Sequence, residues 1–170
     1  MKRQIFNRKI GVIAGAGVHG GLLDSLFENP RIVSVDTPFH DQPIAAKVGT
    51  IKGIQVIFVP RHGWHYEYPS HRVNYRANMF ALKKLGVDVV IAFLASGGLS
   101  TNLRVGDLVL LDSFIDLTKT RLCTYYDLIP VFIPMADPYD SVTRNIILRA
   151  RVATNQHFHK YGAYSVEGDQ

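Results

Sequence analysis

The sequence predicts an α/β domain in which helices pack on a mixed β-sheet. A short apolar run, Ile10–Ala14, leads into a glycine-rich stretch, as a buried strand entering a tight loop does. A second apolar run, Val87–Leu94, directly follows a segment with helical periodicity. Strand, helix and strand in this succession favour the α/β class, and a hairpin pattern between them adds antiparallel strands to the sheet.

The strands of the first half are indicated by their β-branched residues. Ile32–Val35 and Ile54–Val59 have the composition of strands, and Ala46–Ile51 is interpreted as one arm of a hairpin. Lys52-Gly53 stands between that arm and Ile54, where a tight turn is needed. We therefore expect the arm and Ile54–Val59 to pair.

A helix is predicted over His71–Leu85. Its apolar residues recur at helical spacing, and Gly86 is a plausible stop. The residues on one face are Val73, Ala77, Phe80 and Ala81. The strand that follows, Val89–Leu94, is almost wholly apolar, which predicts a central strand buried on both faces.

The second half contains fewer clear elements. Leu108–Leu111 and Phe114–Ile115 are strand candidates, and Tyr161–Val166 is a further one. Ser141 is expected to cap a helix, whose apolar stripe comprises Val142, Ile146, Ala150 and Ala153. Since no repeat, linker or low-complexity stretch interrupts the chain, we predict a single domain over residues 1–170.

Composition restricts the classes of protein that remain. The 170 residues are 47% hydrophobic and 19% charged, which is typical of a globular chain. No apolar run approaches the roughly 20 residues that cross a bilayer, so no membrane association is expected. The single cysteine, Cys123, cannot form an internal disulfide, which favours a reducing compartment and a cytoplasmic location.

The formal charge of +5 is compatible with two kinds of partner. Basic proteins bind nucleic acid when their Lys and Arg residues gather in a run or stripe, but here they are scattered. The sequence therefore predicts no nucleic-acid binding. A modest positive balance also suits a site for a small anion such as phosphate.

Three loops have residues suited to such an anion. Gly15-Ala16-Gly17 could direct backbone N–H groups at a phosphate, although a plain turn explains it equally well. Arg61 and His62, at the end of a predicted strand, form either an anion clamp or an ordinary solvated pair. The loop that begins at Ala95 follows the second apolar run, where α/β sheets gather ligands, and its small residues could equally serve only to turn the chain.

A metal site is not predicted. His65 and His71 are close in the sequence, but no cysteine or carboxylate joins them at the spacing of metal ligands.

The sequence resembles the nucleoside phosphorylase family, and is most similar to its 5′-methylthioadenosine and purine nucleoside members. The similar motifs occur in the family's order and extend over nearly the whole chain. They are Lys9-Ile10-Gly11-Val12-Ile13, Asp36-Thr37-Pro38-Phe39, Arg61-His62-Gly63, Val73-Asn74-Tyr75-Arg76-Ala77-Asn78, Gly106-Asp107, Asp112-Ser113-Phe114-Ile115-Asp116, Thr124-Tyr125-Tyr126-Asp127, Ile133-Pro134-Met135-Ala136-Asp137-Pro138 and Val166-Glu167-Gly168.

The resemblance implies a function and a set of site residues. The family cleaves a purine nucleoside or methylthioadenosine with inorganic phosphate as co-substrate and without a cofactor, and it assembles as a trimer. Arg61 and His62 would grip the phosphate, and the loop of Gly15 and Ala16, with the backbone of Ala95, would complete the cradle. Phe132 falls where the family reaches into a neighbouring subunit's pocket for the 5′-substituent.

The sequence also departs from the family. Ala16 and Leu94 stand where a hydroxyl side chain usually holds phosphate, and Tyr66 takes the place of a histidine. After Val166-Glu167-Gly168 the family continues with a segment that reads the base, whereas here Asp169-Gln170 follow. We therefore expect a nucleoside phosphorylase-like fold that lacks the family's C-terminal segment. Either the protein is a phosphorylase, or it is an inactive, truncated relative that binds at most phosphate or a nucleotide.

Overall fold

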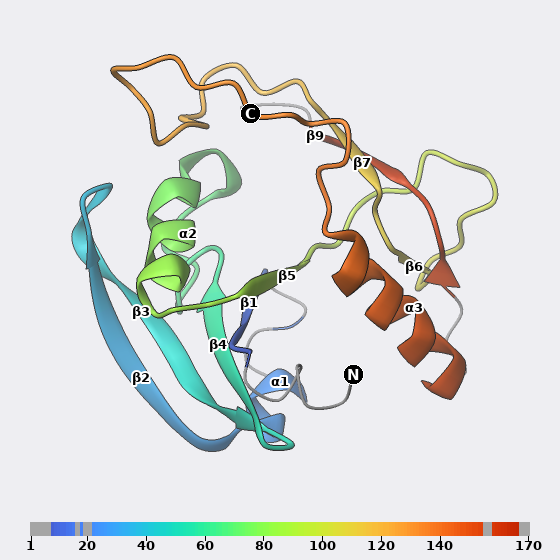
Figure 1. The fold of residues 1–170 in the computed structure, drawn as a ribbon, viewed down its shortest axis with the longest axis horizontal. Coiled ribbons are helices and arrows are strands. Elements are labelled where there is room, and N and C mark those ends of the chain that lie inside the picture. The colour runs from blue at the N-terminus through green and yellow to red at the C-terminus, as the bar shows by residue number, and fades with distance from the viewer. Residues whose placement is uncertain (1–7, 16–17, 19–21, 155–157, 167–170) are drawn as a thin grey trace. The chain divides into compact units, whose positions relative to one another are not determined.

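The computed structural model describes residues 8–15, 18, 22–154 and 158–166 (Figure 1). These residues form two compact units. The first extends to Ala95 and includes Leu122–Tyr125, and the second comprises Ser96–Arg121 and the chain from Tyr126 onward. A single domain over residues 1–170 remains a prediction.

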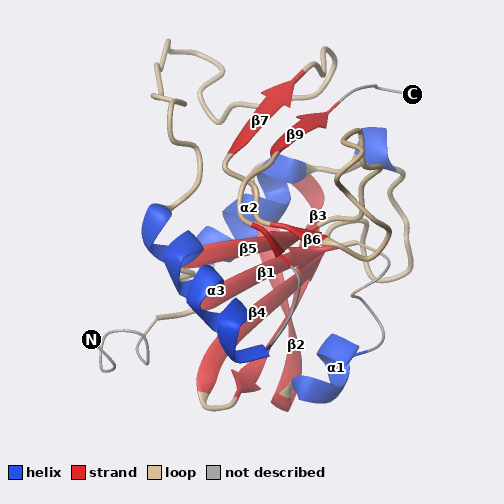
Figure 2. Cartoon of the chain, turned by 90° about the vertical axis from the view of Figure 1, so that its right-hand side faces the viewer, coloured by secondary structure: helices blue, strands red, loops and turns tan. Residues whose placement is uncertain are grey.

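The first unit is built on a five-stranded mixed sheet with the strand order β2-β3-β4-β1-β5 (Figure 2). Strands β4, β1 and β5 are parallel, whereas β2 and β3 pair antiparallel with each other and β3 with β4. The strands are β1 (Ile10–Ala14), β2 (Glu28–Thr37), β3 (His40–Ile51), β4 (Ile54–Pro60) and β5 (Val89–Phe93), and the helices are α1 (Leu22–Leu26), the 3₁₀ turn η2 (Ser70–Arg72) and α2 (Tyr75–Lys84). The predicted mixed sheet is confirmed.

The predicted hairpin is formed by β3 and β4. Ile51 pairs with Ile54, so that only two residues turn the chain. Lys52 and Gly53 both have positive φ, at 50° and 74°. Two positive φ values match the right-handed twist of the paired strands, and this geometry fixes the register of the hairpin.

The hydrophobic core lies on both faces of the sheet. Successive strand residues point to opposite faces, so neighbouring residues of β1 and β4 enter different clusters. One cluster contains Val12, Ala14, Phe27, Val56 and Phe58, and the other contains Ile13, Ala46, Ile57, Val59 and Leu82. Leu82 belongs to α2, which covers the second face with Ala77 and Ala81 also buried.

Helix α2 begins later than the periodicity predicts. Asn74 is its N-cap, and the Asn74 side chain accepts a hydrogen bond of 3.0 Å from the backbone N–H of Ala77. Such a cap satisfies one of the free N–H groups of the first turn. His71 consequently lies in η2, before the helix. At the other end Gly86 has a φ of 77°, as expected for a residue that stops a helix.

The expectation that Val89–Leu94 is a central strand, buried on both faces, is wrong for the part of the chain that the structure describes. Strand β5 lies at the edge of the sheet and pairs with β1, and Phe93 is 46% exposed. The central strand is β4. An apolar run indicates that a strand is suited to burial, but it does not reveal how many strands flank it.

The second unit contains one long helix and two short parallel ladders. Strand β6 (Leu108–Val109) pairs with β8 (Phe158–His159), and β7 (Ser113–Asp116) pairs with β9 (Ala163–Val166). Helix α3 spans Ser141–Thr154, but its cap is Asp140 rather than Ser141. The Asp140 carboxylate accepts a 2.7 Å hydrogen bond from the backbone N–H of Thr143.

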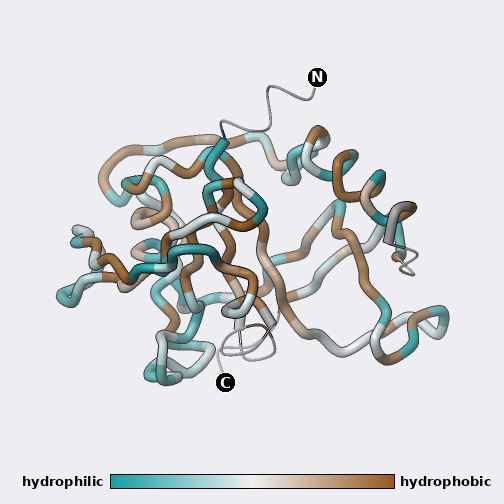
Figure 3. Tube along the Cα trace, turned by 90° about the horizontal axis from the view of Figure 1, so that it is seen from below, coloured by the Kyte–Doolittle hydropathy of each residue, from teal (hydrophilic) through white to brown (hydrophobic). Residues whose placement is uncertain are grey.

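Hydrophilic residues are spread along both units. Figure 3 shows short hydrophilic segments alternating with hydrophobic ones along the coloured trace. Among the described residues, no helix has the length and apolar character needed to span a membrane.

Candidate functional site

Three parallel strands bring the predicted loops to one edge of the sheet. In register, Ala14 at the end of β1 lies between Pro60, the last residue of β4, and Phe93, the last residue of β5. Gly15, Arg61 and the chain leading to Ala95 therefore all leave the sheet at the same edge. Ligands of open α/β sheets gather at this carboxyl edge.

Arg61 lies directly against Gly15. The Arg61 backbone N–H donates a 2.9 Å hydrogen bond to the carbonyl of Ala14, which anchors the start of the loop. A Cβ atom placed on Gly15 would come within 2.7 Å of the Arg61 Nη2 atom. The guanidinium thus lies over the glycine turn, where a side chain would displace it. Ala16, the next predicted site residue, lies outside the described residues.

The hydrogen bonds of His62 define its tautomer. Nδ1 is 2.9 Å from the carbonyl oxygen of Tyr68, and a carbonyl can only accept, so Nδ1 carries the proton. Nε2 accepts a 3.3 Å hydrogen bond from Arg61 Nε–H, so His62 is neutral in this arrangement. Its Nε2 and the Arg61 guanidinium adjoin each other. An oxyanion at that point could accept hydrogen bonds from the guanidinium, and a protonated oxygen of that anion could donate to Nε2 in place of the Arg61 Nε–H group.

The loop that supplies Arg61 and His62 is held from several sides. Asn78 of α2, only 7% exposed, donates a 3.4 Å hydrogen bond to the carbonyl of Arg61. Gly63 has a φ of 82°, and a Cβ there would overlap the carboxylate of Glu67. That same carboxylate accepts a 3.1 Å hydrogen bond from the backbone N–H of His65. The clamp residues therefore sit on a defined loop rather than on a freely solvated one.

Ala95 and Phe132 are the other predicted site residues. Ala95 is exposed and follows β5 at the same edge of the sheet. Phe132 belongs to the second unit and is 94% exposed. Its role at a neighbouring subunit stays a prediction.

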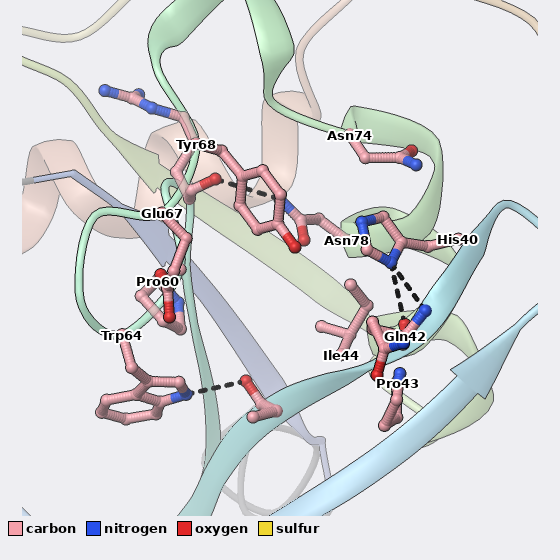
Figure 4. Close-up of a pocket in the computed structure, with 13 residues that line it drawn as sticks. His40, Gln42, Pro43, Ile44, Pro60, Trp64, Glu67, Tyr68, Asn74 and Asn78 are labelled. Carbon is pink, nitrogen blue, oxygen red and sulfur yellow. Dashed lines mark hydrogen bonds between the residues drawn. The ribbon is translucent and has the colours of Figure 1, made fainter.

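A pocket that the sequence did not reveal lies beside the loop, with a volume of about 230 Å³ (Figure 4). It lies between the start of β3, the loop after β4, and α2. His40 meets the edge of Tyr68 at a ring-centroid distance of 5.6 Å, and Trp64 Nε1 donates a 3.1 Å hydrogen bond to the carbonyl of Ala45. The residues that line the pocket come from three separate segments, so no single sequence motif could have indicated it.

A metal-binding cluster is not found in the described part of the chain, where no three His, Cys, Asp or Glu side chains gather. At the carboxyl edge of the sheet, the described residues include the Arg61 guanidinium and the His62 imidazole, which adjoin each other.

Comparison with known proteins identifies the family. The family model described as the Phosphorylase superfamily matches residues 9–166. This chain belongs to the phosphorylase superfamily. The resemblance noted in the sequence is thus confirmed, and the nucleoside phosphorylase-like fold is confirmed with it.

Several relatives within the superfamily are methylthioadenosine phosphorylases. The chain is 41% identical over 162 residues to S-methyl-5′-thioadenosine phosphorylase of Pyrococcus horikoshii, covering 94% of this chain and 61% of that protein. It is 38% identical over 159 residues to a probable 6-oxopurine nucleoside phosphorylase of Dictyoglomus turgidum, covering 92% and 59%. The chain therefore spans about 61% of the length of the S-methyl-5′-thioadenosine phosphorylases of Pyrococcus horikoshii and Pyrococcus furiosus.

Solved structures of methylthioadenosine phosphorylase have a fold similar to that of this chain. Methylthioadenosine phosphorylase from Schistosoma mansoni in its apo form superposes with a TM-score of 0.86 at 29% identity, covering 96% of this chain and 66% of that one. The same enzyme in complex with tubercidin gives a TM-score of 0.85, covering 96% and 65%.

The close approach of Arg61 to Gly15 yields a first prediction. Gly15→Ala should leave the fold intact, because the atom that the new methyl group meets is the far end of a flexible side chain. It should displace the guanidinium and weaken phosphate binding about 10-fold or more, the loss of roughly one charge-assisted hydrogen bond. Isothermal titration with phosphate measures the effect.

A double variant provides the control. Gly15→Ala combined with Arg61→Ala should bind phosphate no more weakly than Arg61→Ala alone, since the glycine acts through the arginine. Additive losses would show that Gly15 contributes by another route.

Proposed function

We propose that this chain carries the phosphate-binding part of a purine nucleoside phosphorylase, with methylthioadenosine as the favoured nucleoside. The observation that supports the proposal most directly is the Arg61 guanidinium packed over Gly15 beside the neutral His62. The names of the relatives support the choice of nucleoside, because five of the first six are S-methyl-5′-thioadenosine phosphorylases.

The proposed reaction requires placement and charge rather than a cofactor. A phosphate oxygen forms a bond to C1′ of the sugar while the bond from C1′ to the purine nitrogen breaks. The bonding pair leaves with the base, which takes up a proton, and the pentose 1-phosphate remains. Positive charge develops on the sugar, so an anionic phosphate held beneath it both attacks and stabilises that charge.

In this scheme Arg61 and His62 bind the phosphate, which is the co-substrate. The N–H groups of the loop at Gly15 and Ala16, and the backbone at Ala95, would bind its remaining oxygens. More of the hydrogen bonds to phosphate would come from backbone N–H groups here than in the family, because Ala16 and Leu94 have no hydroxyl group. Each charge-assisted hydrogen bond that is lost costs about 1.5–3 kcal/mol.

The wider assembly is also proposed. A homo-oligomer, a trimer by family resemblance, would let Phe132 reach the 5′-substituent bound by a neighbouring subunit. Its exposure of 94% leaves the ring available for such a contact. A cytoplasmic location is proposed because the single Cys123 cannot form an internal disulfide.

Binding of ribose 1-phosphate, in which a hydroxyl group replaces the methylthio group of the product from methylthioadenosine, tests the function. Ribose 1-phosphate should displace phosphate from residues 1–170 and should bind at least as tightly, because it presents the same anion with the sugar attached. Titration calorimetry with each ligand alone, then in competition, gives the comparison. Phosphate binding without competition by ribose 1-phosphate would favour the alternative of a relative that binds an anion but has no phosphorylase site.

An activity assay completes this test. Residues 1–170 alone are expected to release little or no adenine from methylthioadenosine, since the resemblance places the base contacts in a segment beyond Gly168. Release of adenine can be followed by coupled absorbance with and without phosphate. Robust, phosphate-dependent release would contradict the expectation and would show that the described part of the chain already holds the base.

A further inference from the structure

Tyr66 has an unusual backbone conformation. Among the described residues other than glycine, Asn29, Lys52 and Tyr66 have positive φ values, at 49°, 50° and 59°. Asn tolerates this region, and Lys52 lies in the two-residue hairpin turn that requires it. A bulky aromatic residue is unfavourable there, and no such turn demands it at position 66. Backbone strain of this kind persists where the surrounding structure enforces it, and it is concentrated at functional sites.

Burial of the ring does not explain the strain, since Tyr66 is 48% exposed. What the conformation achieves is a contact with His62. The two rings stack, with centroids 5.8 Å apart and planes inclined by 22°. The loop is closed around them by a 3.1 Å hydrogen bond from the Tyr68 backbone N–H to the carbonyl of His62.

The imidazole of His62 is consequently fixed on three sides. The Tyr68 carbonyl binds Nδ1, the Arg61 Nε–H binds Nε2, and the Tyr66 ring covers one face. The two hydrogen bonds alone leave the ring free to rock about the axis that joins its nitrogens. A stacked ring opposes that motion, because any tilt separates the two faces.

We propose that Tyr66 is a positioning residue for His62, which holds the imidazole in the plane where Nε2 faces an anion beside Arg61. The proposal rests on the proposed phosphate site. Tyr66 itself does not contact the phosphate. Its contribution is to keep His62 in the orientation in which Nε2 can accept a hydrogen bond from a protonated oxygen of the bound anion.

Tyr66→Gly separates this role from a merely structural one. Glycine accepts the positive φ without strain but has no ring, so the melting temperature should change by no more than about 3 °C, because relief of strain and added chain entropy oppose each other. Phosphate affinity, measured by titration calorimetry, should nevertheless fall by about 5–10-fold, a loss typical of one oriented contact.

Two variants serve as controls. Tyr66→Phe keeps the stack and should bind phosphate within about twofold of the parent, consistent with the ring rather than the hydroxyl making the contact. Lys52→Gly relieves the same kind of backbone strain in the hairpin turn and should leave phosphate affinity unchanged. Unchanged affinity in Tyr66→Gly would overturn the proposal.

NMR spectroscopy of the His62 ring tests the role of Tyr66 without any ligand. NMR order parameters of the His62 Cδ2–H and Cε1–H bonds should be high in the parent and in Tyr66→Phe and lower in Tyr66→Gly, because rocking about the axis through the two nitrogens moves these bonds. Identical order parameters in all three proteins would contradict the positioning role. If the parent fails to bind phosphate, the proposed function fails, while these spectra still decide whether Tyr66 orders His62.

Discussion

Arg61→Ala should abolish the stabilisation that phosphate gives to this protein. In the parent, phosphate at 100 times its dissociation constant should add about 2.7 kcal/mol to the free energy of unfolding, which corresponds to roughly 5–10 °C in melting temperature for a chain of this size. The guanidinium is permanently charged, and it adjoins Gly15 and His62 at the carboxyl edge of the sheet. Its removal should weaken phosphate binding about 100-fold or more.

The matched control is Arg31→Ala, which removes the same charge from an exposed position in β2. This variant should retain the full phosphate-dependent rise in melting temperature, and sulfate should act like phosphate on both proteins. If Arg61→Ala keeps the rise, the anion binds elsewhere. A parent protein that shows no rise at millimolar phosphate would remove the basis for the site altogether.

The largest expected effect on stability comes from Phe58→Ala. Phe58 is fully buried in β4, the central strand, and its ring meets that of Trp64 with centroids 5.9 Å apart. Truncating a buried phenylalanine leaves a cavity and typically lowers the free energy of unfolding by about 3–5 kcal/mol. Urea denaturation followed by Trp64, the only tryptophan of the chain, would measure the loss.

Phe93→Ala is the comparison on the edge strand. Since Phe93 is 46% exposed, its truncation should cost about 1 kcal/mol or less. An equal loss in both variants would indicate that the exposed side of β5 is covered in solution. That outcome would reverse the assignment of β5 as an edge.

The sequence was most informative where local rules govern the chain. The Lys52-Gly53 turn follows local backbone preferences and was predicted. The cap at Asn74 also follows a local preference, but the predicted helix began earlier, at His71, and so included this residue. The meeting of Gly15 with Arg61 was also predictable, because parallel strands carry the loops at their carboxyl ends to one edge. Residues distant in sequence are thus brought together by a rule of topology rather than by a motif.

Other features could not be predicted from the sequence. The apolar composition of Val89–Phe93 would suit a central strand as well as the edge strand that β5 is. Asp140 caps α3 one residue before the predicted cap, because Ser and Asp are both good caps and lie next to each other. The stacking of Tyr66 on His62 depends on a positive φ that the sequence around it does not demand.

The register of β1 has a consequence for how the site could arise during folding. Ile10 pairs with Val56 on one side and with Val89 on the other, so both neighbours of β1 come from distant parts of the chain. A slip by one residue would exchange Val12 and Ile13 between the two faces of the sheet and would carry Gly15 away from Arg61. The register that packs the interior is therefore also the register that places Gly15 against Arg61. Phosphate binding would serve as a probe for chains in which β1 has reached this register through its non-local contacts.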